Sequence, residues 1–491
     1  MPRFYVENFG CRAARADGEA VSARLRAEGL DESGLNAADV VVINTCSVTA
    51  EADRDARAFV RKTQRANPAA KIVVTGCYAQ RAPEEIAGLA GVSAVVGNSH
   101  KGLVPGIVHG LLEEVDSAAV SRTGPGEMIA AASLFARGDG QASIWADDRF
   151  AHSYIEDAQV MPGLEPGTQT RPNLKIQEGC GNRCTFCVIP TTRGASRSLA
   201  AEKVLAQVRG FVAAGGNELV LSGINLGRWG RDLPENRSLA GLLREILNDT
   251  GPDETGPDLT RLARLRLSSI EPMDWTPELI GLMGEFGGSR IARHAHLPLQ
   301  SGSDAVLRRM HRRYRPWHYA QKVVALVEAG GPELGLGADV MVGFPGESER
   351  EFRETFDFIA ALPFSYLHLF PFSPRPGTRA WELHRQTPVA PQAVTERMAA
   401  LRSLAGKKAH AFRARLVGRV LPAITLHTAA GLASKGRTSA LTDNYLPVEI
   451  TGALAANELV EVRIAGIAES EALAGETLAG AFKTAMAVTG K

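Results

Sequence analysis

Each of the three cysteines in the first 115 residues of this chain follows a short run of strand-forming residues. Cys11 comes after the segment 4–7, and Cys46 and Cys77 come after β-branched runs. The pattern predicts strands at 4–7, 39–43, 71–76 and 93–96, with helices at 17–28 and 51–66. Continuous β-branched strands between helices indicate a doubly wound parallel sheet.

The carboxyl ends of parallel strands share one edge of a sheet, where ligands bind. Cys11, Cys46 and Cys77 are therefore expected to converge in space, although they are far apart in the sequence. The alternative is that each is a buried small hydrophobe. All three lie at strand ends and no other cysteine lies in this region, which favours a functional role.

The other three cysteines, Cys180, Cys184 and Cys187, have the spacing C-x3-C-x2-C and follow a strand predicted at 173–177. Three thiolates on one loop can bind three irons of a 4Fe–4S cluster and leave the fourth iron open. Structural zinc is the alternative, but a closed zinc site requires four ligands. The loop contains no histidine, and the nearest one upstream is His152.

Strand and helix patterns divide the chain into four segments. The segment 1–115 is the parallel-sheet domain, and 116–170, broken by Gly and Pro, reads as a linker or insertion. Residues 171–417 contain six strand–helix units, which predict a partial or complete (β/α) barrel that ends in a helix at 391–417. Residues 418–489 predict a small antiparallel β domain. Barrel strands are expected at 173–177, 218–222, 263–268, 293–297, 336–342 and 365–370, and strands of the small domain at 419–426, 446–450 and 459–464.

Six cysteines in 491 residues are too few for a disulfide scaffold. No signal peptide or membrane span is evident, so a cytoplasmic location with reduced thiols is expected. Lys+Arg is 55 and Asp+Glu is 54. Two runs nevertheless contain no acidic residue: 397–419, and 308–322 with Tyr314, Trp317 and Tyr319. Both runs are expected to bind RNA phosphates, and the aromatic residues of 308–322 are expected to stack on bases. The alternative is that each run is a solvated helix face.

The cysteine loop resembles that of the radical S-adenosylmethionine (SAM) superfamily, whose hallmark is C-x3-C-x2-C after the first barrel strand. The resemblance implies that SAM chelates the open iron and is split to methionine and a 5′-deoxyadenosyl radical. Functional residues of barrels follow the strands. The candidates for SAM binding are Phe186, Gly223, Asn225, Ser269, Glu271 and Gln300. The segment 215–218 looks like the superfamily's Gly-Gly-Glu motif but precedes its strand, so we expect it to lie at the wrong end of the barrel.

Nearly all of 1–485, except 116–170, resembles the radical SAM methylthiotransferases, which have a three-cysteine domain, a radical SAM domain and a small β domain called TRAM. The segments that carry the resemblance include 8–11, 43–49, 74–80, 175–198 and 369–378. The resemblance implies that Cys11, Cys46 and Cys77 bind a second 4Fe–4S cluster, whose sulfur is methylated by one SAM and inserted with a second. One departure is Ala14, where the family usually has Asn.

The family has three branches, which act on threonylcarbamoyladenosine or isopentenyladenosine of tRNA, next to the anticodon, or on an aspartate of a ribosomal protein. The run 44–49 with Ala52, Asp53 and Arg57 looks most like the first branch, since the second tends to have Arg in place of Thr49. The expected partners are tRNA, SAM and an electron donor such as a flavodoxin or ferredoxin, without a membrane. Other classes are an electron-transfer iron–sulfur protein, which does not need so large a barrel, and a zinc-stabilised RNA-binding module.

Overall fold

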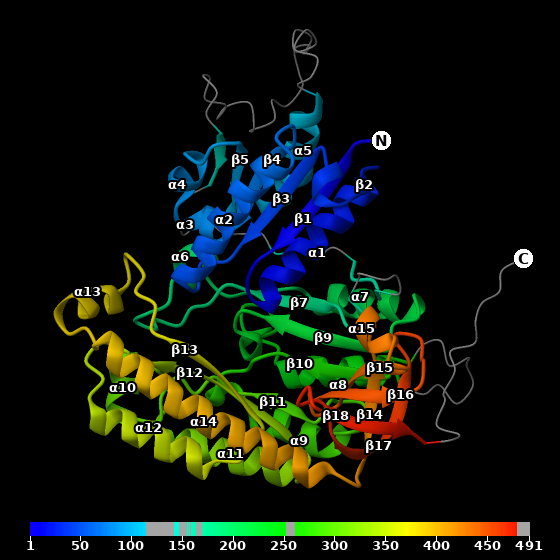
Figure 1. The fold of residues 1–491 in the computed structure, drawn as a ribbon, viewed down its shortest axis with the longest axis vertical. Coiled ribbons are helices and arrows are strands. Elements are labelled where there is room, and N and C mark those ends of the chain that lie inside the picture. The colour runs from blue at the N-terminus through cyan, green and yellow to red at the C-terminus, as the bar shows by residue number, and fades with distance from the viewer. Residues whose placement is uncertain are drawn as a thin grey trace, which may run out of the picture. The chain divides into compact units, whose positions relative to one another are not determined.

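The computed structural model describes residues 1–113, 142–146, 155, 157, 159–163, 169–251 and 261–478 (Figure 1). The chain divides into two compact units. The N-terminal unit consists of Met1–Gln159, Gln177–Arg197 and Ser373–Thr378, and the barrel unit of Val160–Ile176, Ser198–Phe372 and Arg379–Lys491. No helix within the described ranges is long and apolar enough to cross a membrane.

The N-terminal unit is built on a parallel sheet with the strand order β2-β1-β3-β4-β5-β6. The strands are β1 (Arg3–Asn8), β2 (Asp31–Glu32), β3 (Val40–Thr45), β4 (Lys71–Gly76), β5 (Val92–Gly97) and β6 (Ser143–Trp145). The helices are α1 (Arg12–Ala27), α2 (Ala50–Ala66), α3 (Cys77–Arg81), α4 (Pro83–Ala87) and α5 (Val104–Glu113).

Alternate residues of β3 pack on opposite faces of this sheet. Val41 and Ile43 belong to a core with Ala56 and Val60 of α2. Val40 and Val42 belong to a second core, with residues of α1 and α5. Both faces are therefore covered by helices, which confirms the predicted doubly wound sheet and explains why β3 is uniformly apolar up to Ile43.

Strand β6 is not expected from the sequence, which assigns its residues to the linker 116–170. Ser143 and Trp145 pair in parallel with Ala94 and Val96 of β5, so the segment forms the edge of the sheet. A strand of three residues is too short to show a periodic pattern. Most of the rest of 116–170 lies outside the described residues.

The barrel unit has all six predicted barrel strands. They are β7 (Asn173–Glu178), β9 (Glu218–Gly223), β10 (Arg264–Leu267), β11 (His294–His296), β12 (Gly335–Val342) and β13 (Tyr366–Pro371). The last two residues of β7 group with the N-terminal unit. With β8 (Arg197–Ser198), the strands form two sheets, β10-β9-β7-β8 and β11-β12-β13. A parallel bridge joins Leu265 of β10 to Ile291, which lies just before β11. The parallel pairing of β9 with β10 and of β11 with β12 and β13 gives the partial barrel expected.

Helices alternate with these strands along the chain. They are α6 (Ile189–Thr192), α7 (Ala201–Ala213), α8 (Leu239–Asp249), α9 (Pro277–Phe286), α10 (Asp304–Arg309), α11 (Pro316–Gly330), α12 (Glu349–Ala361), α13 (Arg379–Gln386) and α14 (Pro391–Leu416). Ser348 begins α12 with a capping box, because its hydroxyl accepts from the Glu351 amide while the Glu351 carboxylate accepts from the Ser348 amide.

A small five-stranded closed barrel follows α14, coloured orange to red in Figure 1. Its strands are β14 (Val420–Thr425), β15 (Arg437–Thr442), β16 (Pro447–Thr451), β17 (Leu459–Ile467) and β18 (Leu473–Thr477), and α15 (Ala430–Ala433) lies between the first two. The pairings are antiparallel except between β16 and β18, which are parallel. Strands β15 and β18 escape prediction because they are rich in small and polar residues.

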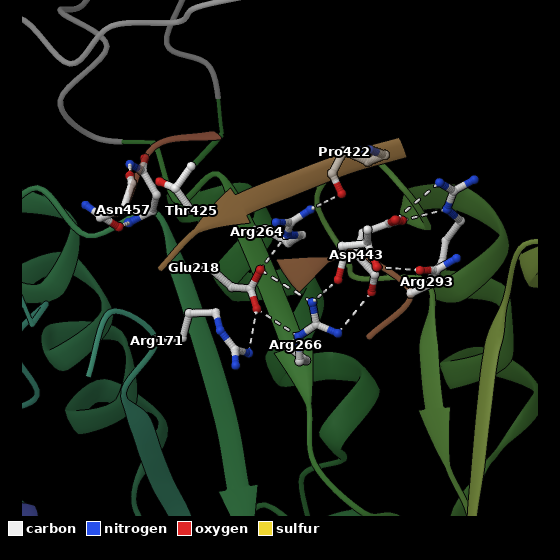
Figure 2. Close-up of polar contacts among 12 residues, drawn as sticks. Arg171, Glu218, Arg264, Arg266, Arg293, Pro422, Thr425, Asp443 and Asn457 are labelled. Carbon is white, nitrogen blue, oxygen red and sulfur yellow. Dashed lines mark hydrogen bonds and ion pairs between the residues drawn. The ribbon is translucent and has the colours of Figure 1, made fainter. Parts of the chain in front are cut away.

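One buried carboxylate connects the barrel strands to this small barrel (Figure 2). Glu218, at the start of β9, accepts from Arg264 Nε at 2.6 Å, Arg266 Nε at 2.8 Å and Arg171 Nη1 at 3.2 Å. Arg266 also donates to the backbone oxygens of Thr442 and Asp443, at 3.0 and 2.9 Å. Glu218 thus lies at the amino end of its strand, as expected for the 215–218 segment, and not at the end where SAM is expected.

The ionised form of Glu218 depends on these arginines. Burial alone raises the pKa of a carboxyl group, but Arg266, Arg264 and Arg171 outweigh burial and hold the pKa of Glu218 well below its usual range. Removing one partner of a buried ion pair costs about 3–5 kcal/mol, because the other charges remain buried.

We predict that Glu218→Gln lowers the free energy of unfolding of the barrel unit by about 3–5 kcal/mol. Because the folded pKa is depressed, the contribution of Glu218 is present above the unfolded pKa of about 4.3 and is lost as the pH falls through the folded value. Urea unfolding followed by tryptophan fluorescence measures this effect. The control is Glu202→Gln, since Glu202 is an exposed partner of Arg237, and we expect a change below about 1 kcal/mol. Equal effects of the two substitutions would contradict the prediction.

Candidate functional site

The first three cysteines lie at one edge of the N-terminal sheet. Their strands β1, β3 and β4 are neighbours, with Asn8 paired to Asn44 and Thr45 paired to Gly76. Cys46 directly follows β3, Cys77 directly follows β4, and Cys11 precedes α1. The sheet therefore carries three thiols from distant parts of the sequence to the same edge.

Cys46 lies in the electrostatic field of the other two thiols of this set. Burial raises the pKa of Cys46 to about 12, with further contributions from the negative charges of Cys11 and Cys77. The backbone turns beside it at Gly10, which has a φ of +109°. A Cβ atom on Gly10 would lie 2.5 Å from Cys46 Cβ and 2.8 Å from Cys46 Sγ, so only glycine leaves room for the thiol.

The second three cysteines lie on the loop between β7 and α6, which also belongs to the N-terminal unit. Cys180 N donates to Gly194 O at 3.0 Å, and Cys187 N donates to Cys184 O at 3.2 Å. Gly179 has a φ of +70°, and a Cβ there would lie 1.9 Å from Ala195 O. The loop is therefore held in one conformation by its own backbone, and its three thiols are partly exposed.

The buried guanidinium of Arg193 contacts Cys77 of the first set and Glu178, which lies two residues before the second set. Arg193 Nε donates to Cys77 Sγ at 3.1 Å, and Arg193 Nη1 donates to Glu178 Oε1 at 2.8 Å. Its Nη2 donates to Asp17 Oδ2 at 3.1 Å, and Asp17 also accepts from Lys101 Nζ at 2.8 Å. Burial alone lowers the pKa of Arg193, but Cys77, Glu178 and Asp17 together raise it well above its usual value. The sequence does not suggest this role, because the contacts join residues far apart along the chain.

Both sets of thiols suit iron–sulfur clusters. Each offers three sulfur ligands, and no disulfide joins any of the six cysteines. N–H groups also point at the sulfurs: Asn98 Nδ2 lies 3.5 Å from Cys77 Sγ, and Asn182 N lies 3.4 Å from Cys180 Sγ. A buried thiol with a raised pKa binds metal only when a strong positive charge compensates its ionisation, which iron supplies.

The residues expected to bind SAM fall into both units. Phe186 lies in the cysteine loop of the N-terminal unit. The others lie in the barrel unit after strand ends: Gly223 and Asn225 at β9, Ser269 and Glu271 after β10, and Gln300 after β11. Their assignment to SAM remains a prediction.

Two of these residues have buried polar atoms that suit a ligand. Gln300 Oε1 and Ser269 Oγ are buried and have no hydrogen-bond partner among the described residues. Gln300 has a φ of +64°, and its backbone is held between Asp339 O and Met341 N at 2.8 and 2.9 Å. A buried polar atom without a partner is costly in a protein, so these atoms fit a bound molecule that supplies donors. Glu271 differs, because its Oε2 accepts from Arg312 at 2.5 Å.

Three further side chains, which belong to no sequence motif, meet on strands β11, β12 and β13. His296 Nε2 lies 3.2 Å from Asp339 Oδ2, and His368 Nδ1 lies 3.3 Å from Asp339 Oδ1. Such a set can hold a metal ion. Burial raises the pKa of Asp339, but its bonds to His296 and His368 outweigh burial and hold the pKa well below its usual range. The carboxylate is thus stabilised without an ion.

The expectation of base stacking in the run 308–322 is wrong for two of its aromatic residues. Tyr314 and Tyr319 are fully buried, and their hydroxyls donate to the backbone oxygens of Leu299 and Leu297. Trp317 is 52% exposed, so base stacking stays a prediction for this residue. The ring positions follow from α11, which buries Tyr319 against the barrel while Trp317 lies on another face.

Acidic residues from other elements also neutralise much of the two basic runs. Arg312 pairs with Glu271, Arg309 with Glu351, and Arg397 with Glu347. The cations of α14 and its end that remain exposed are Arg402, Lys407, Arg415 and Arg419. An acid-free stretch of sequence therefore overstates the free positive charge of the folded chain.

Comparisons with known proteins agree with this architecture. Residues 3–97 match the family described as "Uncharacterized protein family UPF0004", and residues 174–359 match the Radical SAM superfamily. A radical SAM methyltransferase from Kitasatospora setae, TsrM, with cobalamin and a [4Fe-4S] cluster bound, has a similar fold with a TM-score of 0.55. It is 15% identical, and the match covers 79% of this chain and 78% of that one. Fold and cysteine motif thus define a radical SAM enzyme.

Relatives of full length narrow this class. The threonylcarbamoyladenosine tRNA methylthiotransferase MtaB of Aquifex aeolicus is 35% identical over 460 residues, which are 93% of this chain and 99% of that protein. The tRNA-2-methylthio-N(6)-dimethylallyladenosine synthase of Geobacter metallireducens is 30% identical over 466 residues, which are 94% and 95%. The chain belongs to the radical SAM methylthiotransferases, which use 4Fe–4S clusters and SAM, and it most resembles the MtaB type.

We predict that Gly10→Ala displaces Cys46 and lowers the iron bound after anaerobic reconstitution. The matched control is Gly29→Ala, because Gly29 also has a positive φ but a methyl group there would meet nothing within 4 Å. We expect the control to cost about 1 kcal/mol of stability and to keep its iron. Iron per chain and circular dichroism separate the two outcomes, and equal iron in both variants would contradict the steric role of Gly10.

Proposed function

We propose that this radical SAM tRNA methylthiotransferase methylthiolates C2 of N6-threonylcarbamoyladenosine next to the anticodon of tRNA. In this proposal Cys11, Cys46 and Cys77 hold one 4Fe–4S cluster, Cys180, Cys184 and Cys187 hold another, and two SAM molecules are used per product. The observation that carries the proposal is the grouping of the six cysteines into two sets of three. Each set leaves one iron of a four-iron cluster open.

Residues near the cysteines and after the barrel strands have specific roles in this proposal. When bound, the second cluster and SAM supply the one-electron chemistry that replaces an unactivated C–H bond. The Glu178 carboxylate accepts from Gly179 N at 3.1 Å and from Arg193, and so orients the chain that enters Cys180. Gln300 and Ser269 offer buried polar atoms to SAM, and the buried barrel strands exclude water from the reactive groups.

Residues at the start of α2 support threonylcarbamoyladenosine as the proposed substrate. Thr49, where the isopentenyl branch tends to have Arg, is the N-cap of this helix and accepts from Ala52 N at 3.2 Å. Asp53 is buried and accepts from Arg81 at 2.8 Å and Arg375 at 2.6 Å. These contacts fix the conformation of the segment after Cys46. The residues of this segment that resemble the threonylcarbamoyl branch thus have structural roles in the N-terminal unit. The 35% identity to the Aquifex enzyme also favours this branch.

The decisive measurement is mass spectrometry of tRNA nucleosides from a strain that lacks this protein. We predict loss of the methylthio group from threonylcarbamoyladenosine and its return when the wild-type chain is supplied. Loss from isopentenyladenosine instead, or from a ribosomal-protein aspartate, would replace the proposed substrate by one of the other two in the family. An electron donor of the flavodoxin or ferredoxin kind is part of the proposal.

We further predict that Cys46→Ala still cleaves SAM reductively but inserts no sulfur, because it changes only the first set of cysteines. Iron should fall from about eight to about four per chain. The companion variant Cys184→Ala should lose SAM cleavage with a similar loss of iron. If Cys46→Ala abolished SAM cleavage while the iron of the second set was intact, the division of labour between the two sets would be refuted. Zinc in place of iron would refute the clusters themselves.

A further inference from the structure

Arg193 is buried inside the N-terminal unit, between Cys77 of the first cysteine set and Glu178, which precedes the second set. Its side chain is 1% exposed, and its three donor groups contact α3, β7 and α1. The contact with Cys77 Sγ, at 3.1 Å, is shorter than the 3.5 Å contacts of Asn98 Nδ2 with Cys77 Sγ and of Val48 N with Cys46 Sγ. A buried guanidinium that donates to a cysteine sulfur stabilises negative charge on that sulfur and on any metal cluster that the sulfur binds.

The charges around Arg193 are closely balanced. Asp17 is 1% exposed and accepts from both Arg193 and Lys101, while Glu178 accepts from Arg193 through both of its oxygens. Two carboxylates thus offset two cations. The Nε–H of Arg193 is directed to Cys77, so its positive charge faces a sulfur rather than a third carboxylate.

We propose that Arg193 is a positioning residue that raises the reduction potential of the cluster held by Cys11, Cys46 and Cys77. This inference rests on the proposed function, because it takes that cluster as bound. Reduction adds negative charge to a cluster, and an N–H···S bond from a fixed cation stabilises the reduced form. Since Glu178 lies two residues before Cys180, the donor is anchored by the chain that carries the second set.

The test measures a potential instead of enzyme activity. A full-length chain with Cys180, Cys184 and Cys187 all changed to Ala keeps only the first set of cysteines, so one cluster reports. After anaerobic reconstitution, a redox titration followed by electron paramagnetic resonance gives its reduction potential. Arg193→Gln, which removes the charge, should shift the potential to more negative values, and Arg193→Lys should shift it less.

A second variant moves the potential in the opposite direction. Glu178→Gln keeps Arg193 but removes a carboxylate that offsets its charge, so the potential should become more positive. A general loosening of the structure would not give shifts of opposite sign. The matched control is Arg290→Gln in the barrel unit, since Arg290 is also buried but donates to Leu247 O and Thr250 O, and the potential should stay unchanged.

The outcomes separate this inference from the proposed function. If the chain with only the first set of cysteines binds no cluster, the proposed function fails. If the cluster forms and neither Arg193→Gln nor Glu178→Gln moves its potential, the inference is overturned while the proposed function stands. If Arg193→Gln holds no iron, the sign of the shift in Glu178→Gln decides: a positive shift supports the role of Arg193, and no shift or a negative one overturns it.

Discussion

The carboxyl ends of all strands of a parallel sheet lie at the same edge, and the chemistry proposed for this protein depends on that constraint. In the N-terminal unit, β1, β3 and β4 are neighbours, so the residues after them meet although the cysteines are more than thirty positions apart. In the barrel unit the same rule puts Ser269 and Gln300 after strand ends, where their buried polar atoms suit a ligand. The opposite end of β9 begins with Glu218, whose contacts are structural. The candidate ligand-binding residues and the ion pairs of Glu218 thus lie at opposite ends of the barrel strands.

Buried charge is handled in the same way in both units. Glu218 contacts three arginines, and Arg193 and Lys101 contact two carboxylates, so each of these two buried networks contains more than one ion pair. Removing one member of such a network leaves the others buried without compensation, which costs more than the network contributes when it is complete. A net charge of +1 therefore does not show that many of the charged side chains are paired in buried networks. Such pairing also explains why the basic runs carry less free charge when folded than their sequences suggest.

The elements that sequence predicts well have strong local patterns. The β-branched runs of β3 and β4 and the six barrel strands are of this kind, and so is the C-x3-C-x2-C spacing. Strands β6, β15 and β18 are missed because their residues are few, small or polar, and they form through pairing with distant strands. Side-chain direction is the other gap: Tyr314 and Tyr319 read as exposed aromatics but are buried. The role of Arg193 depends on contacts with residues 17, 77 and 178, which no local pattern contains.

The replacement of the family's usual Asn by Ala14 is understandable from the packing of α1 against the sheet. Ala14 is 1% exposed, and its backbone oxygen accepts from Asn44 Nδ2. Asn44 Nδ2 also donates to Asn8 Oδ1, at 3.1 Å, and a Cβ on Gly18 would collide with that same Asn8 oxygen. Positions 14 and 18 are one helical turn apart, and at position 18 the Asn8 amide leaves room only for glycine. The side-chain hydrogen bonds along this face of α1 therefore come from Asn8 of β1 and Asn44 of β3, and Ala14 takes part through its backbone oxygen alone.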